Sequence, residues 1–301
     1  MITLPELPTT PGDRRRWSNL PGAAETHAIA QVVSSHKGMI LVIAADTLGA
    51  ERLHDELQFF LGSNKTILHL PDWETLIYDG FSPHQDIISE RLDVLNQLAV
   101  LENGIVVIPA TTLSQRMAPS QFILGSSLVL SKGQKFDIPQ MRRRLQGAAY
   151  RSVETVYEHG EYAVRGAIMD IFPMGSDFPY RVDLFDDEID TLRTFDPETQ
   201  RSLEQVDQVS LLPAREFPLN SDAINQFKDQ WFLRFQGDPR SCPVYRDVAQ
   251  GLSPAGIEYY LPLFFEGLES LFDYLPENTL VFCDDIEPKL QAYWQETEDR
   301  Y

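Results

Sequence analysis

The segments "GEYAVRGAIMDIFP", residues 160–173, and "YRVDLFDDEID", residues 180–190, decide the fold of the central part of this chain. Both alternate apolar and polar residues with a period of two, which is typical of β-strands with one buried face. Gly166 divides the first segment, and the acidic run at residues 186–188 interrupts the second, as hairpin turns do. The two segments therefore predict short antiparallel strands.

The second segment has an unusual outer face. Its apolar residues share one side of the strand: Tyr180, Val182 and Leu184. The other side carries Arg181, Asp183 and Phe185, which places a phenylalanine among charges. Arg165 lies on the polar side of the first segment, so we expect it to share an outer surface with Arg181 and Phe185 if the strands join one sheet. The sequence alone does not show that the strands are adjacent.

Two interpretations of this face remain open on pattern alone. Single exposed apolar residues are common, and an arginine beside an aspartate forms a surface ion pair worth at most about 1 kcal/mol. An aromatic ring flanked by arginines is also typical of a protein-binding hot spot, where truncation costs roughly 2 kcal/mol or more. The pattern by itself favours the first interpretation.

Upstream, strand and helix patterns alternate. Strands are predicted at residues 39–45, 66–70 and 104–110, and helices at residues 47–60 and 82–101. Strand–helix–strand alternation predicts a parallel sheet with helical crossovers.

The pattern changes after about residue 125. A strand (126–133) and a helix that begins at residue 138 and ends near Gly147 precede five short predicted strands: 153–159, 161–166, 167–173, 180–185 and 188–195. Helices follow at 223–235 and 245–252, then a buried strand at 279–284 and a helix from 287. This order predicts an α/β domain interrupted by a smaller, mainly antiparallel α+β insert. The predicted division is 1–125, 126–213 and 214–301, and the uncapped last helix indicates a fragment of a longer chain.

Composition narrows the function classes. The formal net charge of −20 on 301 residues repels phosphate backbones and suits a protein partner with a basic surface. Two distant cysteines form no disulfide or zinc pattern and fit a cytoplasmic protein. No lysine follows a glycine, and the stretch at residues 20–33, where a motor would carry its phosphate loop, holds no lysine. We therefore expect no nucleotide, cofactor or metal site and no catalysis in this chain.

Four segments carry a family resemblance: residues 70–92, 150–202, 211–218 and 253–265. Through them, nearly the whole chain resembles the N-terminal region of bacterial transcription-repair coupling factors, and more loosely UvrB. The resemblance implies a UvrB-like, degenerate motor domain with an inserted module that binds UvrA. It implies recruitment of nucleotide excision repair to stalled RNA polymerase. The full-length family member is an ATP-dependent DNA translocase, and the resemblance implies that it contacts polymerase and DNA only through parts beyond this chain.

The resemblance also implies the docking residues. The family's UvrA-contact positions fall on Arg165, Arg181 and Phe185, and Asp183 shares their face as a weaker candidate. Two alternatives stay open: an ATP-dependent DNA helicase of the UvrB kind, and a module that inhibits a translocase further along the chain.

Overall fold

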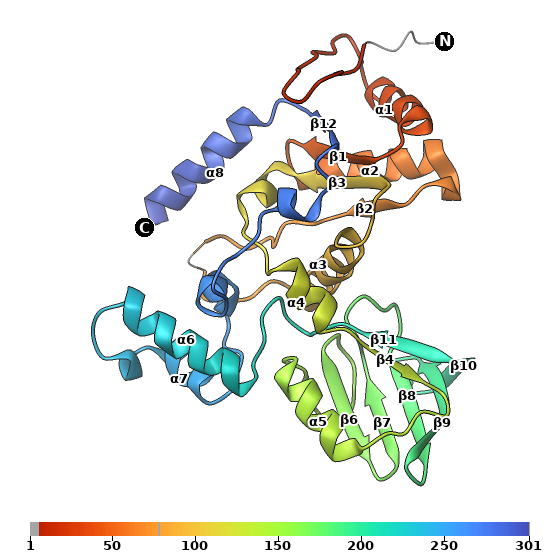
Figure 1. Ribbon diagram of the computed structural model, residues 1–301, viewed down its shortest axis with the longest axis vertical. Coiled ribbons are helices and arrows are strands. Elements are labelled where there is room, and N and C mark those ends of the chain that lie inside the picture. The colour runs from red at the N-terminus through yellow and green to blue at the C-terminus, as the bar shows by residue number, and fades with distance from the viewer. Residues whose placement is uncertain (1–5, 78, 301) are drawn as a thin grey trace. The chain divides into compact units, whose positions relative to one another are not determined.

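The computed structural model describes residues 6–77 and 79–300 (Figure 1). These residues group into two compact units. The first unit contains residues up to 72, residues 97–116 and residues from 270, and the second contains residues 73–96 and 117–269. The second unit therefore interrupts the first along the chain, while the division at 125/126 and 213/214 stays a prediction.

The first unit is built on a parallel four-stranded sheet of order β12-β1-β3-β2. Its strands are β1 (Met39–Ala44), β2 (Ile67–His69), β3 (Gly104–Pro109) and β12 (Leu280–Cys283). Its helices are α1 (Ala24–Ser35), α2 (Thr47–Leu61), α8 (Glu287–Arg300) and the 3-10 turns Gly62–Asn64, Ala110–Ser114 and Leu271–Tyr274. Every residue of β1 and β3 is buried, as expected for inner strands of a parallel sheet. The predicted α/β class with a parallel sheet is confirmed.

Helices α1 and α2 pack together on one face of that sheet. Alternate residues of β1, among them Ile40 and Val42, point into this layer and meet Leu53 and Leu57 of α2. The Asp46 carboxylate accepts a hydrogen bond from the Gly49 backbone N–H at 3.0 Å and so caps the start of α2. The local helix signals and the strand period thus agree with the packing.

The second unit holds a mainly antiparallel sheet of order β10-β9-β8-β7-β6-β5 and a separate antiparallel pair, β11-β4, whose strands are far apart in the sequence. Only the β5–β6 pairing is parallel. The strands are β4 (Leu128–Ser131), β5 (Arg151–Ser152), β6 (Glu161–Arg165), β7 (Ile168–Ile171), β8 (Tyr180–Phe185), β9 (Glu188–Phe195), β10 (Ser202–Val206) and β11 (Gln208–Leu211). The helices are α3 (Gln85–Leu98), α4 (Ser120–Gly125), α5 (Ile138–Gly147), α6 (Ser221–Arg234), α7 (Pro243–Ala249) and the 3-10 turns Pro239–Ser241 and Ile257–Leu263. The predicted mainly antiparallel character is confirmed.

Three local predictions were wrong. Residues 153–159 form an irregular segment with a bend at 154–155 and a turn at its end, where the Glu161 carboxylate accepts the backbone N–H groups of Tyr157 and Glu158 at 2.8 and 3.0 Å. Helix α3 begins at Gln85 and not at Ser82, whose hydroxyl donates to Glu258 at 2.6 Å. Strand β12, predicted to be buried, pairs only with β1 and exposes half of its residues.

The buried carboxyl of Glu258 gives a test of the second unit. Burial raises its pKa, against the lowering effect of the Ser82 hydrogen bond and of Arg215, whose Nε lies 4.0 Å away. The folded state therefore holds this proton more tightly than the unfolded state.

We expect the free energy of unfolding to fall as pH rises from the ordinary glutamate pKa through the raised one. Glu258→Gln removes this dependence, so its unfolding free energy should change less with pH over that window. Urea denaturation at a series of pH values, compared between wild type and variant, measures the difference. Parallel pH profiles for the two proteins would contradict the argument.

Candidate protein-docking face on the antiparallel sheet

One face of the antiparallel sheet builds the core of the second unit. Val182 is buried, and Tyr180 and Leu184 pack against the same cluster, as the alternation in β8 predicts. The other face therefore carries Arg181, Asp183 and Phe185. Strand β7 lies between β6 and β8, so Arg165 reaches this face one strand removed from the others.

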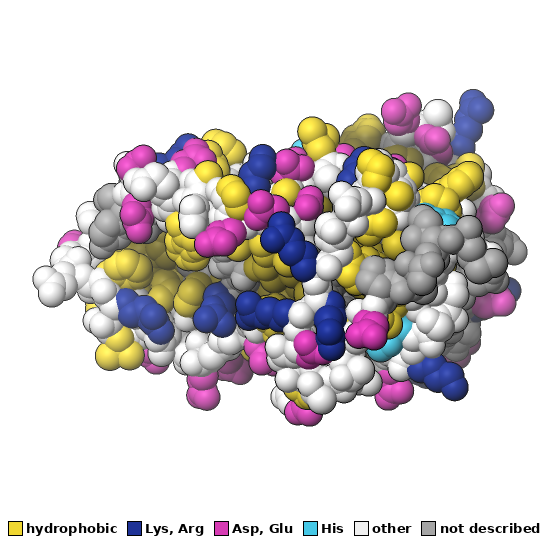
Figure 2. All heavy atoms as spheres, turned by 90° about the horizontal axis from the view of Figure 1, so that it is seen from above, with side chains coloured by type: hydrophobic (Ala, Val, Ile, Leu, Met, Phe, Trp, Pro, Cys, Tyr) yellow, Lys and Arg dark blue, Asp and Glu magenta, His cyan; other side chains and the backbone are white. Residues whose placement is uncertain are grey.

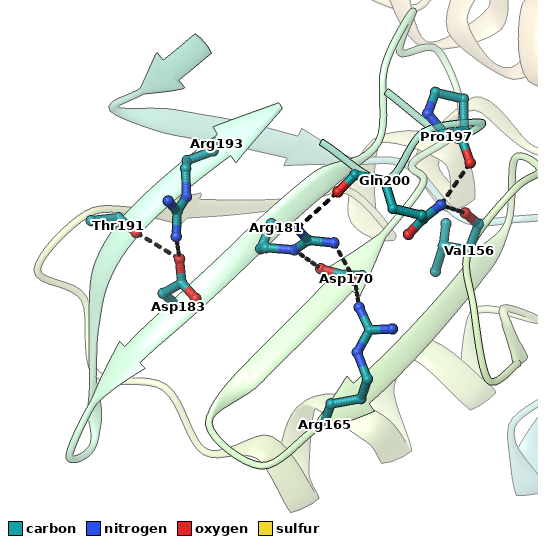
Figure 3. A network of polar contacts seen from close by, with 9 residues as sticks. All are labelled: Val156, Arg165, Asp170, Arg181, Asp183, Thr191, Arg193, Pro197 and Gln200. Atoms are coloured by element: carbon teal, nitrogen blue, oxygen red, sulfur yellow. Dashed lines mark hydrogen bonds and ion pairs between the residues drawn. The ribbon is translucent and has the colours of Figure 1, made fainter. Parts of the chain in front are cut away.

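Strand register places an acid between the two arginines. Asp170 of β7 stands opposite Arg181 of β8, and its side chain is 1% exposed. Its carboxylate accepts two hydrogen bonds from Arg181, from Nε at 2.7 Å and from Nη2 at 3.0 Å, and a third from Nη2 of Arg165 (Figure 3). The tertiary structure thus joins Arg165 and Arg181 through one buried carboxylate.

Arg181 is less accessible than the sequence predicts. Its side chain is only 15% exposed, its guanidinium lies 4.7 Å from the centre of the Phe195 ring, and its Nη1 donates to the Gln200 carbonyl at 3.3 Å. The hydrogen bonds to Asp170 raise its pKa, so it stays charged. The expectation that both guanidinium groups face solvent was wrong for Arg181, whereas the side chain of Arg165 is 49% exposed.

A small second cluster explains this burial. Four buried residues pack together on the polar side of the sheet: Val156, Ala163, Phe172 and Phe195. Gln200 lies in the loop between β9 and β10. Its amide nitrogen donates to the carbonyls of Val156 and Pro197 at 3.0 and 2.6 Å, and these bonds hold the loop against the cluster (Figure 3). This part of the face is therefore covered, and the free part lies toward Arg165 and Phe185.

Phe185 is the most exposed aromatic residue of this face, at 79%. It ends β8 opposite Glu188, next to a turn in which Asp186 has a φ of +57°. A bulge in β9 between Thr191 and Ile189 keeps Leu184 and Ile189 on the core side, so Phe185 stays on the other. The predicted exposure of this ring is confirmed.

Asp183 is engaged within the sheet. Its carboxylate accepts hydrogen bonds from the Thr191 hydroxyl at 2.9 Å and from the guanidinium of Arg193 (Figure 3). Arg193, whose side chain is 34% exposed, stands opposite Arg181 in the register. Sequence reasoning did not single out Arg193, although the alternation through β9 places it on the same face as Thr191.

Other site types find little support in the described part of the chain. Residues 6–77 and 79–300 contain no group of three or more His, Cys, Asp or Glu side chains placed to hold a metal ion. Within the same ranges, no helix has the length and apolar character needed to cross a membrane. On the face shown in Figure 2, Lys and Arg side chains are interspersed with acidic and hydrophobic ones and do not cover it as one basic field. A protein-docking face is the site that the geometry describes best.

Comparison with known proteins gives the class first. A family model of the UvrB interaction domain matches residues 128–217, which include the whole polar face. The chain is also similar along nearly its full length to transcription-repair-coupling factors: 46% identical over 98% of the chain in Escherichia coli (strain K12) and 43% over 99% in Haemophilus influenzae. The corresponding protein of Bacillus subtilis (strain 168) is 25% identical over 89% of the chain.

The resemblance seen in the sequence is therefore confirmed: the chain is similar over nearly its whole length to transcription-repair-coupling factors, and residues 128–217 match the UvrB interaction domain. It spans about a quarter of the length of these relatives, 26% for the proteins of Escherichia coli and Haemophilus influenzae.

Proposed function

We propose that this chain is a non-catalytic adaptor region that binds UvrA and recruits nucleotide excision repair to stalled RNA polymerase. The observation that carries the proposal is the exposed Phe185 ring on the same sheet face as Arg165 and Arg181, inside a UvrB interaction domain. An aromatic anchor beside an arginine is the composition of a binding hot spot. Contacts with RNA polymerase and DNA, and ATP-driven translocation, are proposed for parts of the full-length protein beyond this chain. The proposed location of the protein is the cytoplasm.

The proposed face has a defined contact chemistry. Phe185 offers a ring that a partner pocket can enclose, and the half-exposed guanidinium of Arg165 can pair with a carboxylate. Arg181 and Asp183 are mostly covered by neighbours in the sheet, so they support the face more than they extend from it. Arg165 and Phe185 are therefore the residues on which the test depends.

We expect Phe185→Ala to weaken UvrA binding by about 30-fold, the equivalent of a 2 kcal/mol hot spot. Its side chain makes little contact within the free chain, so thermal stability should stay unchanged. Arg165→Ala should weaken binding in the same direction. Isothermal titration of UvrA into each variant, with calorimetric melting, measures both quantities.

Phe178→Ala is the matched control, because Phe178 is an exposed phenylalanine that precedes the opposite end of β8. It should bind UvrA like the wild type. Arg181→Ala is less informative, since it also removes the main partner of a buried carboxylate and should lower stability. Unchanged affinity in Phe185→Ala and Arg165→Ala would refute this face as the docking site.

The absence of catalysis is part of the proposal. The first unit has a parallel α/β sheet, a fold class that nucleotide-binding domains also use, but the sequence offers no lysine after a glycine to meet phosphate charge. Titration of ATP into the chain should show no binding in the micromolar range. Micromolar affinity would instead support the alternative of a UvrB-like helicase.

A further inference from the structure

The carboxylate of Asp170 has an unusual position in the proposed docking face. It belongs to β7, between the strands that carry Arg165 and Arg181, and its side chain is almost fully buried. Three N–H groups from these two arginines converge on it (Figure 3). The resemblance to known proteins assigns no role to this residue.

The two arginines do different things for that carboxylate. Arg181 meets both oxygens, and a bidentate arginine is the partner that best compensates a buried carboxylate. Arg181 is itself held by the Phe195 ring and the Gln200 carbonyl, so its position is fixed from several sides. Asp170 is thus satisfied largely by Arg181 alone.

Asp170 has its largest effect on the rotamer freedom of Arg165. Its guanidinium is half exposed, and its contact with Asp170 is the only hydrogen bond or ion pair described for its side chain in residues 6–77 and 79–300. A free arginine on a surface samples many rotamers and must lose them when it binds. The bond to Asp170 removes that freedom before any partner arrives.

We propose that Asp170 is a positioning residue of the docking face: it holds the Arg165 guanidinium in a binding-ready orientation, for a partner surface that presents carboxylates. This inference rests on the proposed UvrA docking and names the chemistry of the partner surface. Because the Arg165 side chain is 49% exposed and only its Nη2 donates to Asp170, its other N–H groups can pair with a partner carboxylate without displacing Asp170.

Asp170→Asn tests the inference with almost no change in volume. The amide accepts fewer and weaker hydrogen bonds from guanidinium groups, so Arg165 regains rotamer freedom. We expect UvrA binding to weaken by about 5- to 20-fold, the range of a lost preorganising contact. In an Arg165→Ala background the same substitution should change the affinity by less than about twofold, because the side chain that it positions is gone.

Asp177→Asn is the matched control for charge. Asp177 is an exposed aspartate in the loop before β8, so this variant changes the net charge of the domain equally without touching the arginines. It should bind UvrA like the wild type. A loss equal to that of Asp170→Asn would overturn the inference in favour of a general charge effect.

A second measurement uses the unaltered chain, in case Asp170→Asn does not fold. ¹⁵Nε relaxation of arginine side chains reports their mobility on the nanosecond scale. Arg165 should be markedly more ordered than Arg142, an exposed residue of α5. Equal mobility of the two side chains in the free chain would overturn the inference.

The Phe185→Ala variant separates the hypothesis that UvrA docks at this face from the hypothesis that Asp170 positions Arg165. If it weakens UvrA binding while Asp170→Asn binds unchanged or more tightly, the docking face stands and the role of Asp170 falls. If neither variant changes the affinity, docking at this face fails, and the role of Asp170 fails with it.

Discussion

Arg91→Ala is expected to lower the free energy of unfolding of the second unit by about 3–5 kcal/mol, the cost of removing one partner of a buried ion pair. The Arg91 side chain is 0% exposed, and its Nε donates to Glu216 at 2.8 Å. Its guanidinium lies 5.3 Å from the centre of the Trp73 ring. Without Arg91, the buried carboxylate of Glu216 loses its hydrogen-bonded counter-charge.

If the unpaired carboxylate of Glu216 causes the loss of stability, removing that carboxylate as well should restore stability. Replacing both partners, as Arg91→Met with Glu216→Met, removes both charges of this pair and should recover most of the lost stability. Arg143→Ala, at an exposed position of α5, is the control and should stay within about 0.5 kcal/mol of wild type. Urea denaturation followed by circular dichroism measures all three. A double variant no more stable than Arg91→Ala would show that packing, and not charge, sets the cost.

Phe227→Ala is expected to destabilise the second unit by a similar amount, about 3–5 kcal/mol. Phe227 of α6 is 0% exposed, and its ring centre lies 5.0 Å from that of Phe264 and 5.6 Å from that of Trp231. Truncation removes the transfer free energy of the ring and leaves a cavity among aromatic neighbours that cannot close around it.

The same helix provides a matched control. Phe232 also belongs to α6, but it is 62% exposed, so Phe232→Ala should change the free energy of unfolding by no more than about 0.5 kcal/mol. Thermal melting of the two variants beside the wild type makes the comparison. Equal losses would mean that helix propensity, and not burial, determines the cost of either substitution.

Much of the fold follows from local patterns. The period of two placed Val182 in the core and Phe185 outside it, and both placements are confirmed. The apolar runs of β1 and β3, separated by helix signals, predicted the parallel sheet. These features are readable because each depends on residues close together in the chain.

The errors share a different origin. The predicted strand at 153–159 fails because the Glu161 side chain binds backbone N–H groups near the end of that segment. Edge strand β10 was not predicted, since its largely exposed residues carry no strong alternation. Local pattern gives no signal when a side chain from another position takes the backbone hydrogen bonds, or when a strand lacks a buried face.

The docking face also combines features that the local pattern predicts with features that only the tertiary structure sets. The sequence by itself determined that Arg165, Arg181 and Phe185 stand on the polar sides of their strands, because alternation is fixed within each strand. Only the tertiary structure decided that Asp170 lies between the two arginines and that Phe195 covers one of them. Strand order and register bring these residues together from separate parts of the chain, and no local periodicity encodes which strand becomes the neighbour of which.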